Sequence, residues 1–199
     1  RFPGGINDAE SFRKLLTEER DAVSDVPADR WNVERFYDAE AGIAGKSIAK
    51  RGGFIEGIDQ FDPQFFGISP REAPYIDPMQ RLLLETAWEA MEDAGVILDL
   101  EAGTNIGVIM GVSHNDYQNI QGGSTDRSGI SSHSPTGNAH SIAANRISYC
   151  FNLKGPSLSV DTACSSSLVA VLQLLSRREQ TSLQLVQVSL LPSLVHSSA

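Results

Sequence analysis

Between Gly155 and Leu175 the spacing of apolar residues changes from every second position to every third or fourth. Residues 158–162 alternate in the manner of a short strand, and a run of small residues at 163–167 follows. Beyond that run, apolar side chains recur at helical spacing, at Leu168, Val171, Leu172 and Leu175. The pattern predicts a strand, a sharp turn and a helix, with Cys164 in the turn where the helix begins.

Similar patterns predict three more helices. Asn7 and Glu10 resemble a capping box at the start of a short helix. The Asp-Pro pair at 77–78 supplies an N-cap and a first-turn proline for a longer helix, which Gly95 ends. A third helix is predicted to begin at 137–138, with apolar positions at Ile142, Ala143, Ile147 and Cys150.

The remaining stretches differ in composition. A glycine-bounded apolar run at 105–111 predicts a buried strand, whereas the Gly- and Ser-rich residues 118–136 predict a surface loop. Residues 180–199 carry no charge and are dominated by Leu, Ser, Val and Gln. Alternating apolar positions at 183–190 allow one more strand there, but the run is too short and interrupted to span a bilayer.

Charge and cysteine content narrow the possible functions. The 199 residues have a formal net charge of −9 and a pI of about 4.8. An acidic chain without a basic cluster indicates neither nucleic-acid binding nor a polybasic membrane contact. With two cysteines, Cys150 and Cys164, and no signal segment, we expect a reducing, cytoplasmic location. A disulfide between the two stays open, and it would consume the thiol of Cys164.

One motif suggests a nucleotide site and is rejected. The run from Gly42 to Ser47 ends in the Gly-Lys-Ser of a phosphate-binding loop. That motif needs a further glycine five positions before its second one, where this chain has Glu40, and an apolar strand before it. We therefore expect no nucleotide binding at this run.

Two interpretations of Cys164 remain on these grounds. A free cysteine is most often a small buried hydrophobic residue. At the start of a helix, however, unpaired N–H groups and the positive end of the helix dipole favour the thiolate, which is the nucleophilic form. The small neighbours would admit a substrate carbonyl, and the Cys164 backbone N–H could donate to an oxyanion.

A family resemblance favours the nucleophile. Residues 160–168, Val-Asp-Thr-Ala-Cys-Ser-Ser-Ser-Leu, resemble the active-site signature of β-ketoacyl synthases, above all the ketosynthase domains of modular type I polyketide synthases. The Phe-Phe-Gly-Ile-Ser-Pro-Arg-Glu-Ala run within 61–73 and the opening Arg-Phe-Pro-Gly-Gly resemble the same domains. The resemblance implies a partial N-terminal β-ketoacyl synthase domain at 1–179, followed by a divergent, low-charge tail at 180–199.

The fold that the resemblance implies is α/β and thiolase-like, with layered αβαβα architecture. Only the N-terminal half would be present, with the first strand and the C-terminal half missing. Such a half would expose a large apolar face. The family has a strand ending in a Gly-Gly pair where this glycine-free tail lies. A shifted reading frame, a mis-spliced gene model and a fragment boundary are three hypotheses for that departure.

The implied activity is that of an acyltransferase of the 3-oxoacyl carrier protein synthase type, in polyketide or fatty acid biosynthesis. Cys164 would take an acyl group from an acyl carrier protein, with its backbone N–H in the oxyanion hole. A malonyl-type extender would then lose CO₂ and condense with that thioester. The resemblance implies no metal or organic cofactor, because substrates arrive on the phosphopantetheine arm of the carrier protein, and it implies a homodimeric parent enzyme.

The chain departs from the family in lacking segments that resemble the family's two histidine motifs. Family enzymes pair the cysteine with two histidines from the second half of the fold. None of the four histidines here lies in a segment resembling those motifs: His114, His133, His140 and His196. We therefore expect the chain to be inactive alone. Two alternatives stay open: a non-catalytic remnant or dimerisation scaffold from a truncated or frame-shifted gene, and a protein that transfers or hydrolyses acyl groups without condensing them.

Overall fold

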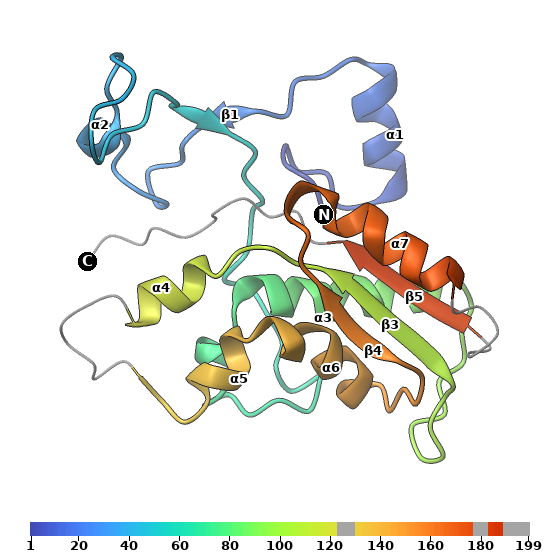
Figure 1. Cartoon of the computed structure of the whole chain (residues 1–199). Coiled ribbons are helices and arrows are strands. Elements are labelled where there is room, and N and C mark those ends of the chain that lie inside the picture. Colours follow the sequence, from blue (N-terminus) through green and yellow to red (C-terminus); the bar gives the residue numbers. More distant parts are fainter. Residues whose placement is uncertain (123–129, 177–182, 189–199) are drawn as a thin grey trace. The chain divides into compact units, whose positions relative to one another are not determined.

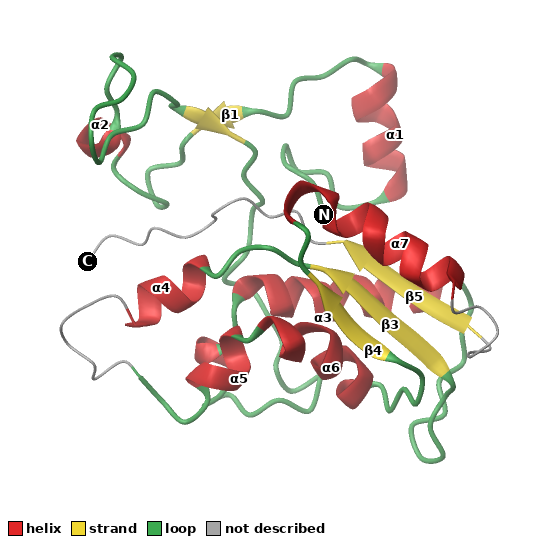
Figure 2. Cartoon of the chain, viewed as in Figure 1, coloured by secondary structure: helices red, strands yellow, loops and turns green. Residues whose placement is uncertain are grey.

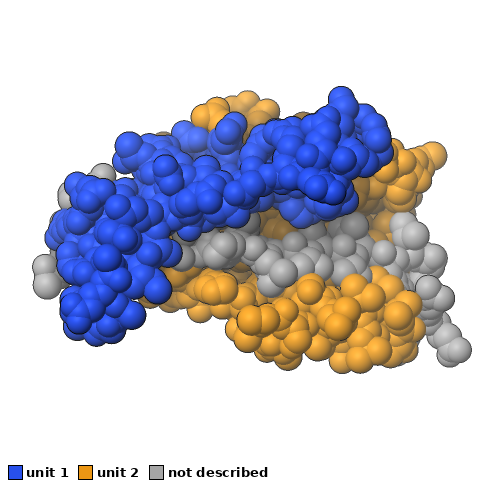
Figure 3. All heavy atoms as spheres, turned by 90° about the horizontal axis from the view of Figure 1, so that it is seen from above, with its two compact units in different colours: residues 1–59, 193–199 blue, residues 60–192 orange. Residues whose placement is uncertain are grey.

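The computed structural model describes residues 1–122, 130–176 and 183–188, in two compact units. Unit 1 contains Arg1–Asp59 and unit 2 contains Gln60–Pro192, and Figure 3 gives each its own colour. Among the described residues, no helix has both the length and the apolar character needed to cross a membrane. The Cys164 turn belongs to unit 2.

Unit 1 consists of short elements joined by irregular chain. They are α1 (Ala9–Thr17), β1 (Ser24–Asp25), α2 (Val33–Phe36) and β2 (Arg51–Gly52). The two strands pair antiparallel. Ile6 and Ile55 are buried in this unit, and the buried Arg30 guanidinium donates to the Ile55 carbonyl at 2.6 Å.

Helix α1 begins with a different capping box from the one predicted. Asp8, not Asn7, is the N-cap, and its carboxylate accepts from the Ser11 N–H at 2.7 Å. The Ser11 hydroxyl accepts in return from the Asp8 N–H at 3.2 Å. Glu10 instead pairs with Arg13 one turn along the helix. The prediction was wrong by one residue, because the Asp8 carboxylate and the Ser11 hydroxyl form the two reciprocal bonds that were expected of Asn7 and Glu10.

The run from Gly42 to Ser47 is a closed turn. The Ser47 N–H donates to the Phe36 carbonyl at 2.7 Å, and the Asp38 N–H donates to the Ser47 carbonyl at 3.0 Å. The chain after Ser47 is irregular until β2. This geometry differs from the strand, loop and helix of a phosphate-binding loop.

Unit 2 is a layered α/β structure around a parallel sheet. Its elements are η1 (Ala73–Tyr75), α3 (Pro78–Asp93), β3 (Ile106–Gly111), α4 (Asp116–Gly122), α5 (Ser134–Asn138), α6 (His140–Cys150), β4 (Ser157–Val160), η2 (Ala163–Ser165), α7 (Ser166–Ser176) and β5 (Leu183–Val188). The strand order is β4-β3-β5, with both pairs parallel. Figures 1 and 2 show α7 on one face of the sheet and α3 with α6 on the other. Every residue of the central strand β3 is buried, as expected for a parallel strand covered on both faces.

The core of unit 2 joins α3, α6 and β3. Helix α3 begins at the predicted N-cap, Asp77, whose carboxylate accepts from the Met79 N–H at 2.8 Å, and Gly95 follows its end with φ 64°. Its buried side packs on apolar residues of the other two elements. The largest fully buried apolar side chains of this core are Ile76, Leu84, Ile106, Val108, Met110, Val112 and Ile147.

Two sequence predictions for unit 2 need correction. Part of the predicted loop at 118–136 is helical, in α4 and α5; residues 123–129 lie outside the described residues. Helix α6 begins at His140 rather than at 137–138, because the extended backbone of Ala139 separates it from α5. Strand β5 confirms the strand allowed in the tail, and residues 177–182, which include the predicted boundary at 179, lie outside the described residues.

The burial of Asp77 predicts that the stability of the fold depends on pH. Burial raises the pKa of Asp77 above its ordinary 3.8, so ionising this carboxyl costs more in the folded chain than in the unfolded chain. The stability it contributes is therefore complete below pH 3.8 and falls as the pH rises through the raised pKa. Asp77→Asn, which keeps a capping oxygen, should gain stability relative to the wild type between about pH 3 and pH 7.

Urea denaturation at both pH values measures this change. The matched control is Asp8→Asn at the exposed N-cap of α1. Hydrogen bonds from the Ser11 backbone and side chain lower the pKa of Asp8, so its contribution is present above pH 3.8 and lost below. Asp8→Asn should therefore lose stability at pH 7. Identical pH responses of the two variants would contradict the interpretation.

Candidate nucleophile site

Cys164 lies in a tight turn between a strand and a helix. The chain leaves β4 at Val160, passes through the single 3₁₀ turn η2, and enters α7 at Ser166. Cys164 is the middle residue of η2, and its side chain is exposed. The predicted strand, turn and helix are confirmed, although the strand ends two residues before Thr162.

Side-chain hydrogen bonds build this turn. The Asp161 carboxylate accepts from the Ala163 N–H at 3.0 Å, and the Ser166 hydroxyl accepts from the Thr162 N–H at 2.9 Å. That hydroxyl also donates to the Ala163 carbonyl at 2.7 Å. Ala163 has φ 52°, in the left-handed region that costs an L-residue energy. The turn is therefore held in a strained shape that presents Cys164 to solvent.

Close backbone packing fixes where the first turn of α7 lies. A Cβ atom added at Gly111, the last residue of β3, would come within 2.9 Å of the Ser166 carbonyl carbon and 3.0 Å of the Ser167 nitrogen. Only glycine allows this approach. The sequence showed Gly111 merely as the boundary of a strand. By contrast, Asp161 two residues before Ala163 was a detectable turn signal that the sequence reasoning missed.

Two of the histidines lie near the carboxyl ends of β3 and β4. The His140 Nε2 atom hydrogen-bonds to the His114 carbonyl at 2.9 Å, and the His140 carbonyl accepts from the Ser159 hydroxyl at 2.6 Å. His133 precedes α5, with its ring 6.3 Å from that of Tyr75. His196 lies outside the described residues. Within the described residues, no histidine hydrogen-bonds to the Cys164 thiol.

The second cysteine has a different environment. Cys150, at the end of α6, is half-buried and packs against the core of unit 2, as the sequence predicted. Burial raises the pKa of its thiol to about 11, so it is almost wholly protonated at neutral pH. Both cysteines are free, which removes the disulfide left open by the sequence. No group of three or more potential metal ligands occurs in the described part of the chain.

Comparisons with known proteins agree with this geometry. The model of the β-ketoacyl synthase N-terminal domain matches residues 1–181. The chain belongs to the β-ketoacyl synthase family, and its layered sheet and helices are the N-terminal part of a thiolase-like fold.

The individual relatives are polyketide synthases. The chain is 51% identical over 171 residues to a phenolphthiocerol/phthiocerol polyketide synthase of Mycobacterium tuberculosis, covering 86% of this chain and 11% of that relative. It is 45% identical over 183 residues to the polyketide synthase GfsA of Streptomyces halstedii, covering 90% of this chain and 2% of that protein. The matched region is thus a small part of each relative's length.

Solved ketosynthase domains have the same architecture. The oxazolomycin ketosynthase domain of Streptomyces albus superposes with a TM-score of 0.76 at 37% identity, covering 90% of this chain and 30% of that domain. The ketosynthase of module 6 of the Bacillus subtilis bacillaene synthase gives a TM-score of 0.72 at 34% identity, covering 89% and 27%. The chain therefore spans about a third of a solved ketosynthase domain or less.

Proposed function

We propose that this chain supplies the nucleophile half of a polyketide ketosynthase, with Cys164 as the residue that carries the acyl group. One observation carries the proposal: Cys164 is exposed in a strained, hydrogen-bonded turn at the start of α7. A nucleophile at such a place is reached by substrate on one side and lies near the positive end of a helix on the other.

The proposed acyl transfer has two bond changes. The Cys164 thiolate attacks the carbonyl of an acyl thioester on an acyl carrier protein, forming a tetrahedral oxyanion that the Cys164 backbone N–H would help to stabilise. Collapse of that intermediate expels the carrier's phosphopantetheine thiolate and leaves the acyl group on Cys164. No metal or organic cofactor takes part in this scheme.

In the second proposed stage, a malonyl-type extender on a carrier protein loses CO₂. The resulting carbanion attacks the Cys164 thioester, expels the Cys164 thiolate and yields a β-ketoacyl product. The family's two histidines, which would assist this stage, belong to the part of a ketosynthase that this chain does not match. We therefore propose that condensation needs that further part, and that this chain alone stops at the acyl-enzyme.

Exposed apolar side chains on α7 support the proposal that a further part of a ketosynthase packs against this chain. Four apolar side chains of this helix are 38–74% exposed: Leu168, Val171, Leu172 and Leu175. An apolar face of this kind is typical of an interface. We propose that the rest of a ketosynthase covers it. Strand β4 is an edge of the described sheet, and an edge strand is a suitable place for the homodimer contact that the resemblance implies.

The test combines two readouts on the full chain. A short acyl group is supplied on an acyl carrier protein, and intact-protein mass spectrometry detects the acyl-enzyme. Labelled malonyl carrier protein is then added, and released CO₂ and β-ketoacyl product are measured. An acyl-enzyme without CO₂ release is the expected result. A folded chain that acquires no acyl group would overturn the proposal in favour of a non-catalytic scaffold, and rapid hydrolysis of the adduct would favour an acyl hydrolase.

A further inference from the structure

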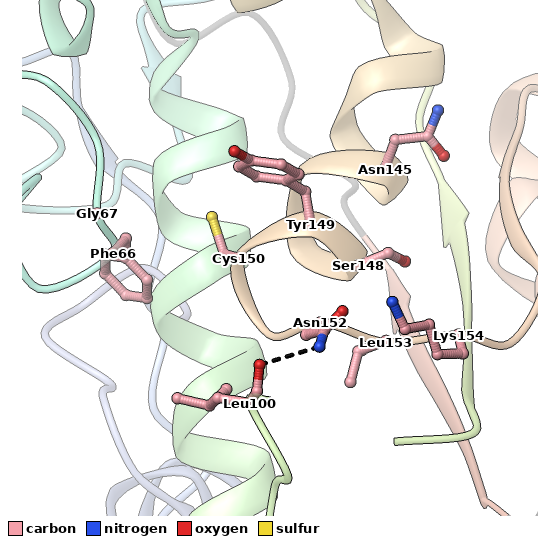
Figure 4. Close-up of a pocket in the computed structure, with 10 residues that line it drawn as sticks. All are labelled: Phe66, Gly67, Leu100, Asn145, Ser148, Tyr149, Cys150, Asn152, Leu153 and Lys154. Atoms are coloured by element: carbon pink, nitrogen blue, oxygen red, sulfur yellow. Dashed lines mark hydrogen bonds between the residues drawn. The ribbon is translucent and has the colours of Figure 1, made fainter. Parts of the chain in front are cut away.

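A groove of about 730 Å³ opens on unit 2 at the end of α6, and none of its lining residues belongs to the Cys164 turn. Three segments far apart in sequence form it: the chain at 66–67, Leu100, and the stretch from Asn145 to Lys154 (Figure 4). Its volume lies in the range of about 300–1,000 Å³ that is usual for small-molecule sites. Nothing in the proposed acyl transfer uses this groove.

The floor of the groove is held by hydrogen bonds within the chain. The Asn152 side-chain amide donates to the Leu100 carbonyl at 2.9 Å, and the Leu153 N–H donates to the Ser148 carbonyl at 2.8 Å. The Lys154 N–H donates to the Thr104 carbonyl at 2.9 Å. These bonds hold the Leu100 and Asn145–Lys154 segments together without a ligand, so binding would require little ordering of the chain.

The two sides of the groove differ in polarity. Figure 4 shows Phe66, Leu100 and Tyr149 toward one side, with the Cys150 sulfur between Phe66 and Tyr149, and it shows Asn145, Ser148 and Lys154 toward the other side. Leu100 is 60% exposed and Tyr149 is 87% exposed. Exposed apolar side chains gathered at a groove indicate a binding surface. Because polar side chains line the other side of the same groove, the ligand that fits it is amphipathic.

The charge of the polar side indicates an anion. Lys154 extends across Gly103, since a Cβ atom added at Gly103 would lie 2.4 Å from Lys154 Cε. In the part of the chain that the structure describes, no carboxylate lies within 4.0 Å of the Lys154 ammonium. None of the lining residues is acidic, although the whole chain has a net charge of −9. A ligand carboxylate would give this ammonium a charge-assisted hydrogen bond.

We propose that the groove binds a carboxylic acid with a linear apolar chain, its carboxylate on Lys154 and its chain against Leu100, Phe66 and Tyr149. Asn145 supplies a polar contact on the side of the carboxylate, whereas the Ser148 hydroxyl already donates to the Ser157 hydroxyl at 3.1 Å. This site is separate from Cys164 and does not depend on the proposed acyl transfer.

Equilibrium dialysis of labelled octanoate with the full chain tests the site. We expect one saturable site, whose affinity falls about tenfold in Lys154→Gln, because a charge-assisted contact of about 1.4 kcal/mol is lost. The matched control is Lys14→Gln, which removes the same charge from α1 and should leave binding unchanged. Lys154→Arg should retain most of the affinity. Octan-1-ol, which has the chain without the carboxylate, should compete at least about tenfold more weakly.

Alkylation of Cys150 is the second readout. Iodoacetamide is applied at about pH 9, where a small thiolate fraction reacts slowly, and peptide mass spectrometry separates Cys150 from Cys164. Octanoate should slow alkylation of Cys150 with the same concentration dependence as in dialysis and leave Cys164 unaffected. The proposal is overturned by absence of saturable binding up to about 10 mM. It is also overturned by equal competition from the alcohol, or by equal effects of the Lys154 and Lys14 variants.

Discussion

Replacing Cys164 by alanine should abolish acylation of this chain. Incubated with a short acyl thioester, the wild type is expected to gain the mass of one acyl group, whereas Cys164→Ala should gain none. The reason is chemical: no other described side chain combines a thiol with exposure at the start of a helix. A loss of at least about 100-fold in the acylation rate is expected when the nucleophile is removed. Intact-protein mass spectrometry over a time course measures it.

The matched control is Cys150→Ala. This variant removes the other thiol, which burial keeps protonated at neutral pH, and it should acylate at the wild-type rate. Cys164→Ser is a second control, because it keeps the size of the side chain but offers a much weaker nucleophile. An adduct that persists in Cys164→Ala and disappears in Cys150→Ala would show that Cys150 carries the acyl group, and it would refute the proposed role of Cys164.

Replacing Gly137 by alanine should have the largest effect on stability. A Cβ atom at this position would lie 2.0 Å from the Tyr75 carbonyl oxygen and 2.7 Å from its carbon. Both atoms belong to backbone, and the Gly137 carbonyl itself accepts from the Asp77 N–H at 2.9 Å at the start of α3. The clash can be relieved only by separating α5 from η1. We expect a loss of about 3 kcal/mol or more in the free energy of unfolding.

Urea denaturation followed by circular dichroism gives this free energy. Gly122→Ala is the matched control, since a Cβ atom at this terminal residue of α4 would meet nothing within 4 Å. That variant should lie within about 0.5 kcal/mol of the wild type. Gly155→Ala is expected to behave like Gly137→Ala, because its Cβ would lie 2.5 Å from the Ile106 carbonyl. Equal stability of the Gly137 and Gly122 variants would contradict the packing argument.

Several side-chain hydrogen bonds together hold the Cys164 turn. Ser166 makes two hydrogen bonds to the backbone of the turn, and Asp161 makes a third. These bonds orient the backbone and leave the thiol exposed. Their contribution to the proposed acyl transfer is therefore positional: they hold a left-handed Ala163 that would otherwise relax.

Much of this molecule could be predicted from local patterns in the sequence. The alternation at 158–160, the helical spacing after Ser167 and the Asp-Pro start of α3 are local signals, so the strand, turn and helices around Cys164 were predicted in type and order. The nine residues around Cys164 also carried enough information to indicate the family, which the comparisons confirm. Predicted boundaries were less accurate, as at α1 and α6, because alternative caps lie one to three residues apart.

Contacts between distant segments could be known only from the folded chain. The approach of Gly111 to Ser166, the packing of Gly137 on Tyr75 and the groove beside Lys154 each join segments that are far apart in sequence. Periodicity records which residues are buried but does not record their partners, since many different neighbours can bury the same side chain. Local sequence was thus enough for the strand, turn and helix around the candidate nucleophile but missed α4 and α5, whereas long-range packing determines how the turn and the groove are built.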